Sequence, residues 1–178
     1  MEGCLALMLL SHGRRQARIN AAGETVPPQD QDHSLWDMNM LMEGDTLVRQ
    51  ALSRRRPGPN QIKAAIAACH ALPDTPDWPQ IRLLYETLIR YEPTDVVRLN
   101  LAVAMAEAGD PQTGLRVLES ISAPLADYQP FHAASAALPA NAGANEAALA
   151  AYALAIALAA SPQDKAFLIA RRDALLQG

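Results

Sequence analysis

The sequence has few aromatic residues and no excess of positive charge. Only 4% of its 178 residues are aromatic although 50% are hydrophobic, so alanine and aliphatic side chains must build the core. Small side chains let helices approach closely, which favours helix-on-helix packing over a sheet rich in β-branched residues. The formal net charge of −4 argues against direct nucleic-acid binding, because such binding needs clustered Lys and Arg side chains to neutralise phosphates.

Cysteine pairs and long apolar runs are also missing. Cys4 and Cys69 form no C-x-x-C pair, and we expect both to be small buried residues in a reducing, cytoplasmic compartment. The longest apolar run extends from Ala147 to Ala160, which is shorter than the roughly 20 residues that span a bilayer. The sequence therefore predicts no membrane partner and no disulfide framework.

Motifs for catalysis and cofactor binding are absent as well. The sequence contains no G-x-S-x-G element, no P-loop and no dinucleotide-binding glycine pattern. His12, His70 and His132 are isolated from one another and from any H-E-x-x-H context, so no set of metal ligands can be assembled from spacing. We expect His70 and His132 to be partly buried structural residues. We therefore predict that the chain is not an enzyme and that it binds no cofactor or metal.

What the sequence does contain is helical periodicity, which predicts an all-α fold. The segment Glu2 to Ser11 is apolar almost all round and should be buried on several sides. A long helix is expected from about Leu35 to Arg54, with Ser34 and Asp37 as its capping box. The break at Pro57-Gly58-Pro59 should separate it from a third helix.

From Asp77 onward, short helical segments alternate with tight turns. Pro93 and Pro162 each begin or precede a predicted helix, and they lie 69 residues apart, close to twice the tetratricopeptide period of about 34 residues. This pattern predicts helical hairpins in a tetratricopeptide-like array. We therefore divide the chain into a helical N-terminal subdomain, residues 1–76, and tetratricopeptide-like repeats, residues 77–178.

One segment is too polar to be a routine connection between helices. It reads Asp30-Gln31-Asp32-His33-Ser34-Leu35-Trp36-Asp37. Its carboxylates and imidazole could belong to a metal or acid/base site, although no further ligands converge on it by spacing. Alternatively, it is a structural and docking element, in which Trp36 anchors the segment to the core. Asp30, Gln31 and Asp32 would then bind free backbone N–H groups or arginines such as Arg14, Arg15 and Arg18.

These eight residues resemble the D-Q-D-R-x-x-W-D signature in the C-terminal extension of a group of extracytoplasmic function (ECF) sigma factors. Other motifs of that extension occur in the expected order over nearly the whole chain: Leu5 to Leu10, Arg14-Arg15-x-Ala17-Arg18, Gly58-Pro59-Asn60-Gln61, Thr75-x-Asp77-Trp78 and Val96-Val97-x-Leu99-Asn100. His33 stands where the family usually has Arg, and Asn60 replaces a usual aromatic residue.

The resemblance implies a tetratricopeptide-like domain that follows two DNA- and polymerase-binding sigma domains. Those domains would lie before Met1, so we expect this chain to be an excised C-terminal domain or a truncated product. The implied function is non-catalytic regulation of transcription initiation in the cytoplasm. The implied partners are the N-terminal sigma domains, the RNA polymerase core or a regulatory protein.

By the same resemblance, the docking signature would comprise Asp30, Gln31, Asp32, Trp36 and Asp37, with Gly58, Pro59 and Gln61 as the adjoining turn. Two alternatives stay open. One is a free-standing tetratricopeptide-like scaffold that binds proteins without a role in transcription. The other, more remote, is a metal-dependent hydrolase built around the acidic segment.

Overall fold

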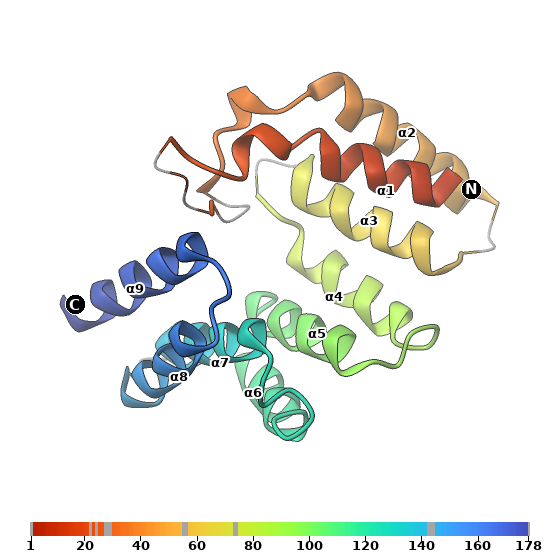
Figure 1. Ribbon diagram of the computed structural model, residues 1–178. Coiled ribbons are helices and arrows are strands. Elements are labelled where there is room, and N and C mark those ends of the chain that lie inside the picture. Colours follow the sequence, from red (N-terminus) through yellow and green to blue (C-terminus); the bar gives the residue numbers. More distant parts are fainter. Residues whose placement is uncertain are drawn as a thin grey trace. The chain divides into compact units, whose positions relative to one another are not determined.

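The computed structural model describes residues 2–21, 23, 25–26, 30–54, 57–72, 75–141 and 145–177. These residues form nine α-helices and include no β-strand, and a long connection with two short 3₁₀ helices, η1 (Arg15–Ala17) and η3 (His33–Leu35), joins the first α-helix to the second (Figure 1). The predicted all-α, helical-hairpin fold is therefore confirmed. The chain divides into two compact units, an N-terminal unit of Met1–Ala22 and Val26–Pro93 and a C-terminal unit of Gly23–Thr25 and Thr94–Gly178.

The N-terminal unit consists of α1 (Glu2–His12), α2 (Met38–Ser53), α3 (Pro59–Ala71) and α4 (Trp78–Leu88). In Figure 1, α1 lies between α2 and α3 and contacts both, while α4 packs on α3. Helices α1 and α2 are antiparallel, because Asp37 before α2 donates its N–H to the Gly13 carbonyl after α1 at 2.8 Å. At the other end of the pair, Arg54 forms an ion pair with Glu2 at 2.6 Å. Arg55 and Arg56, the rest of that basic run, lie outside the described residues.

Small residues allow the close approach of α1 to its neighbours. A Cβ atom on Gly44 of α2 would lie 2.8 Å from Leu10 Cγ, and one on Gly3 would lie 2.8 Å from the backbone nitrogen of Gln61 in α3. Ala6 and Leu41 are fully buried at this interface. The prediction that small side chains bring helices together therefore holds in this unit.

One face of α1, however, is not covered within the N-terminal unit. We expected this helix to be buried on several sides and Cys4 to be a core residue, and both expectations are wrong. Cys4 is exposed, and Leu5 and Met8 keep 48% and 62% of their surface accessible. The reason is that α2 and α3 contact the side of α1 that carries Gly3, Ala6 and Leu10, which leaves the opposite side bare.

The C-terminal unit consists of five helices: α5 (Asp95–Glu107), α6 (Pro111–Ser120), α7 (Gln129–Asn141), α8 (Asn145–Ala157) and α9 (Pro162–Gln177). Consecutive helices pair as hairpins, since α5 packs on α6 and α7 on α8, and α7 also contacts both α5 and α6. The predicted turn residues cap them: Thr94 Oγ1 accepts from the Val97 N–H at 3.3 Å, and Asp110 Oδ1 accepts from Thr113 at 3.2 Å.

The boundary between the units differs from the predicted subdomain boundary between residues 76 and 77. Helix α4 begins at the predicted cap, where Asp77 Oδ1 accepts from the Gln80 N–H at 3.1 Å. We expected α4 to open the repeat array, yet it belongs to the N-terminal unit because it packs on α3 and places Leu84 against the core of that unit. Local capping marks where a helix begins but carries no information about the unit on which it packs.

Candidate functional site

The polar segment 30–37 forms a short 3₁₀ helix, η3 (His33–Leu35), followed by the first turn of α2. Asp32 caps η3, with its Oδ1 accepting the Ser34 N–H at 2.9 Å. Asp37 caps α2, with its Oδ1 accepting the Met40 N–H at 3.1 Å. The predicted capping box of Ser34 with Asp37 and the predicted start near Leu35 are therefore wrong. The sequence pattern predicts one helix here, but Asp32 and Asp37 each cap a separate helix, η3 and α2.

Gln31 is buried, with 8% of its surface accessible, and holds the segment to the end of α1. Its Oε1 accepts from Arg14 Nε at 3.2 Å and from Arg14 Nη2 at 3.0 Å, while its Nε2 donates to the Val26 carbonyl at 3.0 Å. The Gln31 amide therefore connects segment 30–37 both to Arg14, just after α1, and to the backbone at Val26. The expectation that an arginine near residue 14 binds this segment is confirmed for Gln31 and Arg14.

Trp36 anchors the same segment to the core, as predicted. Its side chain is 8% exposed and belongs to the hydrophobic cluster of the N-terminal unit. The Arg14 guanidinium lies over the indole, 5.0 Å from the centroid of the Trp36 ring. The centroid of the His33 ring lies 3.9 Å from the centroid of the same indole. Among the described residues, the buried Trp36 Nε1 has no hydrogen-bond acceptor.

Arg14 is a buried cation whose hydrogen-bond partner in the described part of the chain is a neutral amide. Only 9% of its surface is accessible, and its hydrogen bonds within the described part of the chain go to the neutral Gln31 amide. Burial lowers the pKa of Arg14, and the nearby Arg18 cation lowers it further. Burial likewise lowers the pKa of His70, with Arg14 adding to the effect. The positive charge of Arg14 therefore disfavours protonation of His70 in the same unit.

Asp30 and Asp32 differ from Gln31 and Trp36 because their side chains are exposed. Hydrogen bonds from Ser34 lower the pKa of Asp32, so this carboxylate is ionised at neutral pH. The segment thus has two buried side chains, Gln31 and Trp36, among exposed ones. Gln31 and Trp36 secure it from within, and the two aspartates stand on its solvent side.

The turn formed by Gly58, Pro59 and Gln61 does not adjoin this segment. It begins α3, where Gln61 Oε1 accepts the Gly58 N–H at 3.2 Å and Pro59 occupies the first helical position. Gln61 touches Gly3 near the start of α1, whereas Asp37 touches Gly13 just after its end. Ten residues of helix separate those contacts by about 15 Å. The predicted signature is therefore split between the two ends of α1.

The positions of the ligand-type side chains can be compared over the described residues. Within the described ranges, no group of three or more His, Cys, Asp and Glu side chains is placed to hold a metal ion. His132 is buried and its Nε2 lies 2.6 Å from the Ala126 carbonyl, and the His70 ring meets Trp78 edge to face at 5.2 Å. Both histidines are partly or fully buried structural residues, as predicted. The half-buried Cys69 thiol has a pKa raised by burial and by the Asp77 and Asp45 carboxylates.

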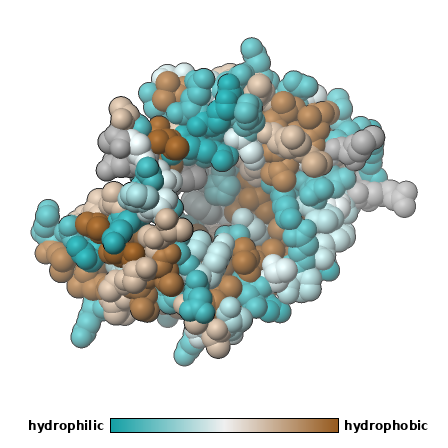
Figure 2. Space-filling view, in the orientation of Figure 1, coloured by the Kyte–Doolittle hydropathy of each residue, from teal (hydrophilic) through white to brown (hydrophobic). Residues whose placement is uncertain are grey.

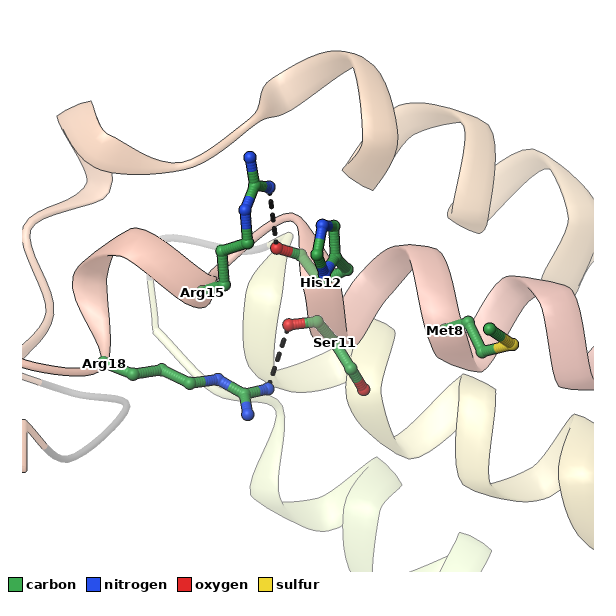
Figure 3. Close-up of a pocket in the computed structure, with 5 residues that line it drawn as sticks. All are labelled: Met8, Ser11, His12, Arg15 and Arg18. Carbon is green, nitrogen blue, oxygen red and sulfur yellow. Dashed lines mark hydrogen bonds between the residues drawn. The ribbon is translucent and has the colours of Figure 1, made fainter.

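Sequence reasoning missed a surface hollow of about 330 Å³ at the C-terminal end of α1. It is lined by Met8, Ser11, His12, Arg15 and Arg18 (Figure 3). Arg15 Nη1 donates to the His12 carbonyl at 3.3 Å, and Arg18 Nη2 donates to the Ser11 carbonyl at 2.9 Å. The available signal was the spacing of Met8, His12 and Arg15 on one helical face, but the apolar run around Met8 indicated burial instead.

Comparison with known proteins adds a family match and one long relative. Residues 1–52 match a family of unknown function, DUF6596. That stretch contains α1, the buried Arg14 and the whole of segment 30–37. An uncharacterized protein of Rhizobium meliloti (strain 1021) is 39% identical to this chain over 178 residues, which cover 98% of this chain and 42% of the relative.

The chain thus spans about two fifths of the length of that relative. No solved structure matches the chain, so its fold is described from its own packing alone. In the described part of the chain, no helix has both the length and the apolar character needed to cross a membrane.

Proposed function

We propose that the chain is a non-catalytic regulatory and protein-interaction module of a bacterial sigma factor. In this role it modulates transcription initiation by binding the N-terminal sigma domains or the RNA polymerase core. The proposal is supported by the resemblance of segment 30–37 to the ECF sigma-factor signature. It is further supported by the match of residues 1–52 to DUF6596, a family known as the C-terminal part of some sigma factors.

The observation that carries the proposal is the two-sided arrangement of the signature. Gln31 and Trp36 are buried and hold an ordered turn, while Asp30 and Asp32 present exposed carboxylates from it. Asp32 Oδ1 caps η3, and the carboxylates of both Asp30 and Asp32 remain exposed at the surface. Charged side chains on a rigid turn provide specificity and steer association with a basic partner surface, which suits a docking element.

Binding measurements test this role. The immobilised chain is exposed to the two DNA- and polymerase-binding domains of a sigma factor of this group and, separately, to core RNA polymerase. We expect one of them to bind, and the variant with Asp30→Asn and Asp32→Asn to bind about tenfold more weakly. At position 32 asparagine keeps the oxygen that caps η3, and thermal unfolding of the variant checks that the fold is retained.

The matched control changes Glu107→Gln and Glu119→Gln, two exposed carboxylates of the C-terminal unit, with the same change of net charge. Equal loss of binding in this control would reduce the effect to net charge and contradict a docking role for segment 30–37. Absence of binding to both partners would refute the sigma-factor module. The helical hairpins of the C-terminal unit would then favour the free-standing protein-binding scaffold.

A further inference from the structure

The uncovered face of α1 ends in a concentration of positive charge. Leu5 and Met8 are exposed along the helix, and the hollow between Met8 and Arg18 continues the same face. Figure 2 shows apolar surface over the region of α1 and α2, with hydrophilic surface beside it. This face therefore combines an apolar stripe with a cationic end.

Within the described part of the chain, the arginines at this end have no acidic partner, unlike several other cations. Arg49, Arg54 and Lys63, for example, form ion pairs with carboxylates of the N-terminal unit. Within the described residues, Arg15 and Arg18 donate only to backbone carbonyls. Each guanidinium has five N–H donors, so most of their donors are available to a ligand.

The view in Figure 3 shows how these groups are arranged. The two guanidinium groups flank the last turn of α1, one on each side, with His12 and Ser11 between them and Met8 one turn earlier. Arg14, immediately adjacent, has its pKa lowered in part by Arg18, so the positive charges are close enough to repel one another. An anionic group bound here would relieve that repulsion.

We infer that this face of α1 is a docking site for an acidic amphipathic helix of a partner protein. Apolar side chains of the partner helix pack along Leu5 and Met8, and its carboxylates bind Arg15 and Arg18. Charge complementarity selects this occupant, because the stripe is apolar and its end is cationic. A helix is the matching shape, since side chains at helical spacing on α1 form a ridge along which a second helix can lie.

The site is separate from the proposed role of Asp30 and Asp32, because it has the opposite charge and uses other residues. Its test is therefore independent of the sigma-factor module. The remaining alternative for Arg15 and Arg18 is that they serve only to satisfy the last carbonyls of α1. Variants can separate these roles, because capping needs an N–H donor whereas docking needs the charge.

The probe is a synthetic 16-residue peptide, side-chain-stapled into a helix, with Leu at positions i, i+3, i+4 and i+7, four Glu on the flanking positions and Ala elsewhere, carrying a fluorophore. We expect saturable binding to the full chain, weakened by added salt. Changing Arg15→Gln with Arg18→Gln should weaken it about tenfold while thermal unfolding is retained, since glutamine still offers an N–H to the carbonyls. Met8→Gln should weaken it about threefold, because an exposed methionine contributes modest apolar area.

Matched controls are available in the same unit. Arg49→Gln with Arg90→Gln removes two exposed cations elsewhere, and Leu83→Gln removes an apolar side chain that is 56% exposed on α4. Neither should change binding of the peptide. In ¹⁵N-labelled protein, the peptide should shift amide signals between Leu5 and Ile19.

Several results would overturn the inference. One is that the acidic peptide fails to bind, and another is that a peptide with Lys in place of Glu binds equally well. A third is that the acidic peptide binds the variant with Arg15→Gln and Arg18→Gln as tightly as it binds the unchanged chain. Signal shifts confined to the C-terminal unit would do the same. So would stronger association with phosphatidylglycerol vesicles that depends on Met8, because the face would then bind an anionic membrane surface.

Discussion

The described interiors of the two units differ in how much polar contact they contain. The N-terminal unit contains a buried polar cluster, in which Gln31 links Arg14 to the Val26 carbonyl beside the Trp36 ring. The described core of the C-terminal unit is mostly apolar, with the buried His132 as its polar side chain, and its helices meet at buried alanines such as Ala102 and Ala136, as those of the N-terminal unit do at Ala6. A polar cluster specifies one arrangement of a loop, whereas small apolar residues let successive helices pack in a repeated way.

This difference indicates where function is most sensitive to substitution. In the N-terminal unit, Gln31 and Trp36 together hold segment 30–37 and so determine how it presents its exposed aspartates. In the C-terminal unit, the geometry depends on helix caps and on close helix contacts that are distributed along the chain. Substitutions should therefore act by different mechanisms in the two units.

The largest expected effects come from truncating one core leucine in each unit. Leu10→Ala and Leu118→Ala should each lower the free energy of unfolding by about 2–5 kcal/mol. Both tryptophans, Trp36 and Trp78, lie in the N-terminal unit, so their fluorescence reports on that unit, while far-UV circular dichroism reports on both. In urea titrations, Leu10→Ala should move the fluorescence transition more than Leu118→Ala does. Equal movement would show that the units unfold as one.

The buried polar cluster should show strong coupling between its members. Gln31→Leu leaves the buried Arg14 without its acceptor, and we expect it to cost about 1–3 kcal/mol of stability. Arg14→Met should cost a similar amount. The loss of stability in the double variant should be smaller, by about 1 kcal/mol, than the summed losses of the two single variants. The reason is that the double variant replaces both polar partners with apolar groups. A double-mutant cycle by urea unfolding measures this energy, and strict additivity would mean that the pair contributes nothing specific.

Close helix contact in the C-terminal unit can be probed at Gly114. A Cβ atom there would lie 2.6 Å from the backbone oxygen of Ala102, so Gly114→Ala should destabilise by about 1–3 kcal/mol despite the better helix propensity of alanine. Gly44→Ala is the comparison, since its Cβ would meet the Leu10 side chain, which can adjust more readily than a helix backbone. We expect its loss of stability to be smaller. A stabilising Gly114→Ala would show that α5 and α6 have room to separate.

The smallest effect concerns pH. The pKa of His70 is lowered from 6.5 in the folded chain, so the unfolded chain binds more protons below about pH 6.5. Stability should therefore decrease as the pH falls through this region. Arg14→Met should raise the pKa of His70, because one cation that disfavours its protonation is removed. NMR titration of the imidazole signal measures the shift, and His70→Gln should flatten the pH dependence of stability below about pH 6.5. An unchanged pKa in the Arg14→Met variant would exclude electrostatic contact between the cluster and His70.

Much of the secondary structure could be predicted because helix capping depends on residues close in sequence. Asp77, Thr94 and Asp110 cap the helices that were expected to follow them. The failure at Ser34 has the same origin, because Asp32 and Asp37 both satisfy the local rule and take the two caps between them. A choice among neighbouring capping residues depends on how the segment packs, which local spacing does not reveal.

The candidate site was predicted in part. The segment 30–37, the burial of Trp36 and a link to an arginine were all anticipated, since an indole and a buried amide need specific partners. The separation of Gly58 and Gln61 from that segment was not, because family motifs are ordered along the sequence and not in space. The bare face of α1 was also missed, since an apolar run alone does not say how many neighbours cover it.

By itself, the sequence determined the helical class of this protein, most helix starts and the unusual polarity of one segment. Each of these follows from composition or from residues within a few positions of one another. Only the tertiary structure decided that Gln31 faces Arg14, that Asp30 and Asp32 face solvent, and that the cationic end of α1 is open. Those outcomes depend on which helix faces pack together, and such long-range packing is set by the shapes of whole surfaces.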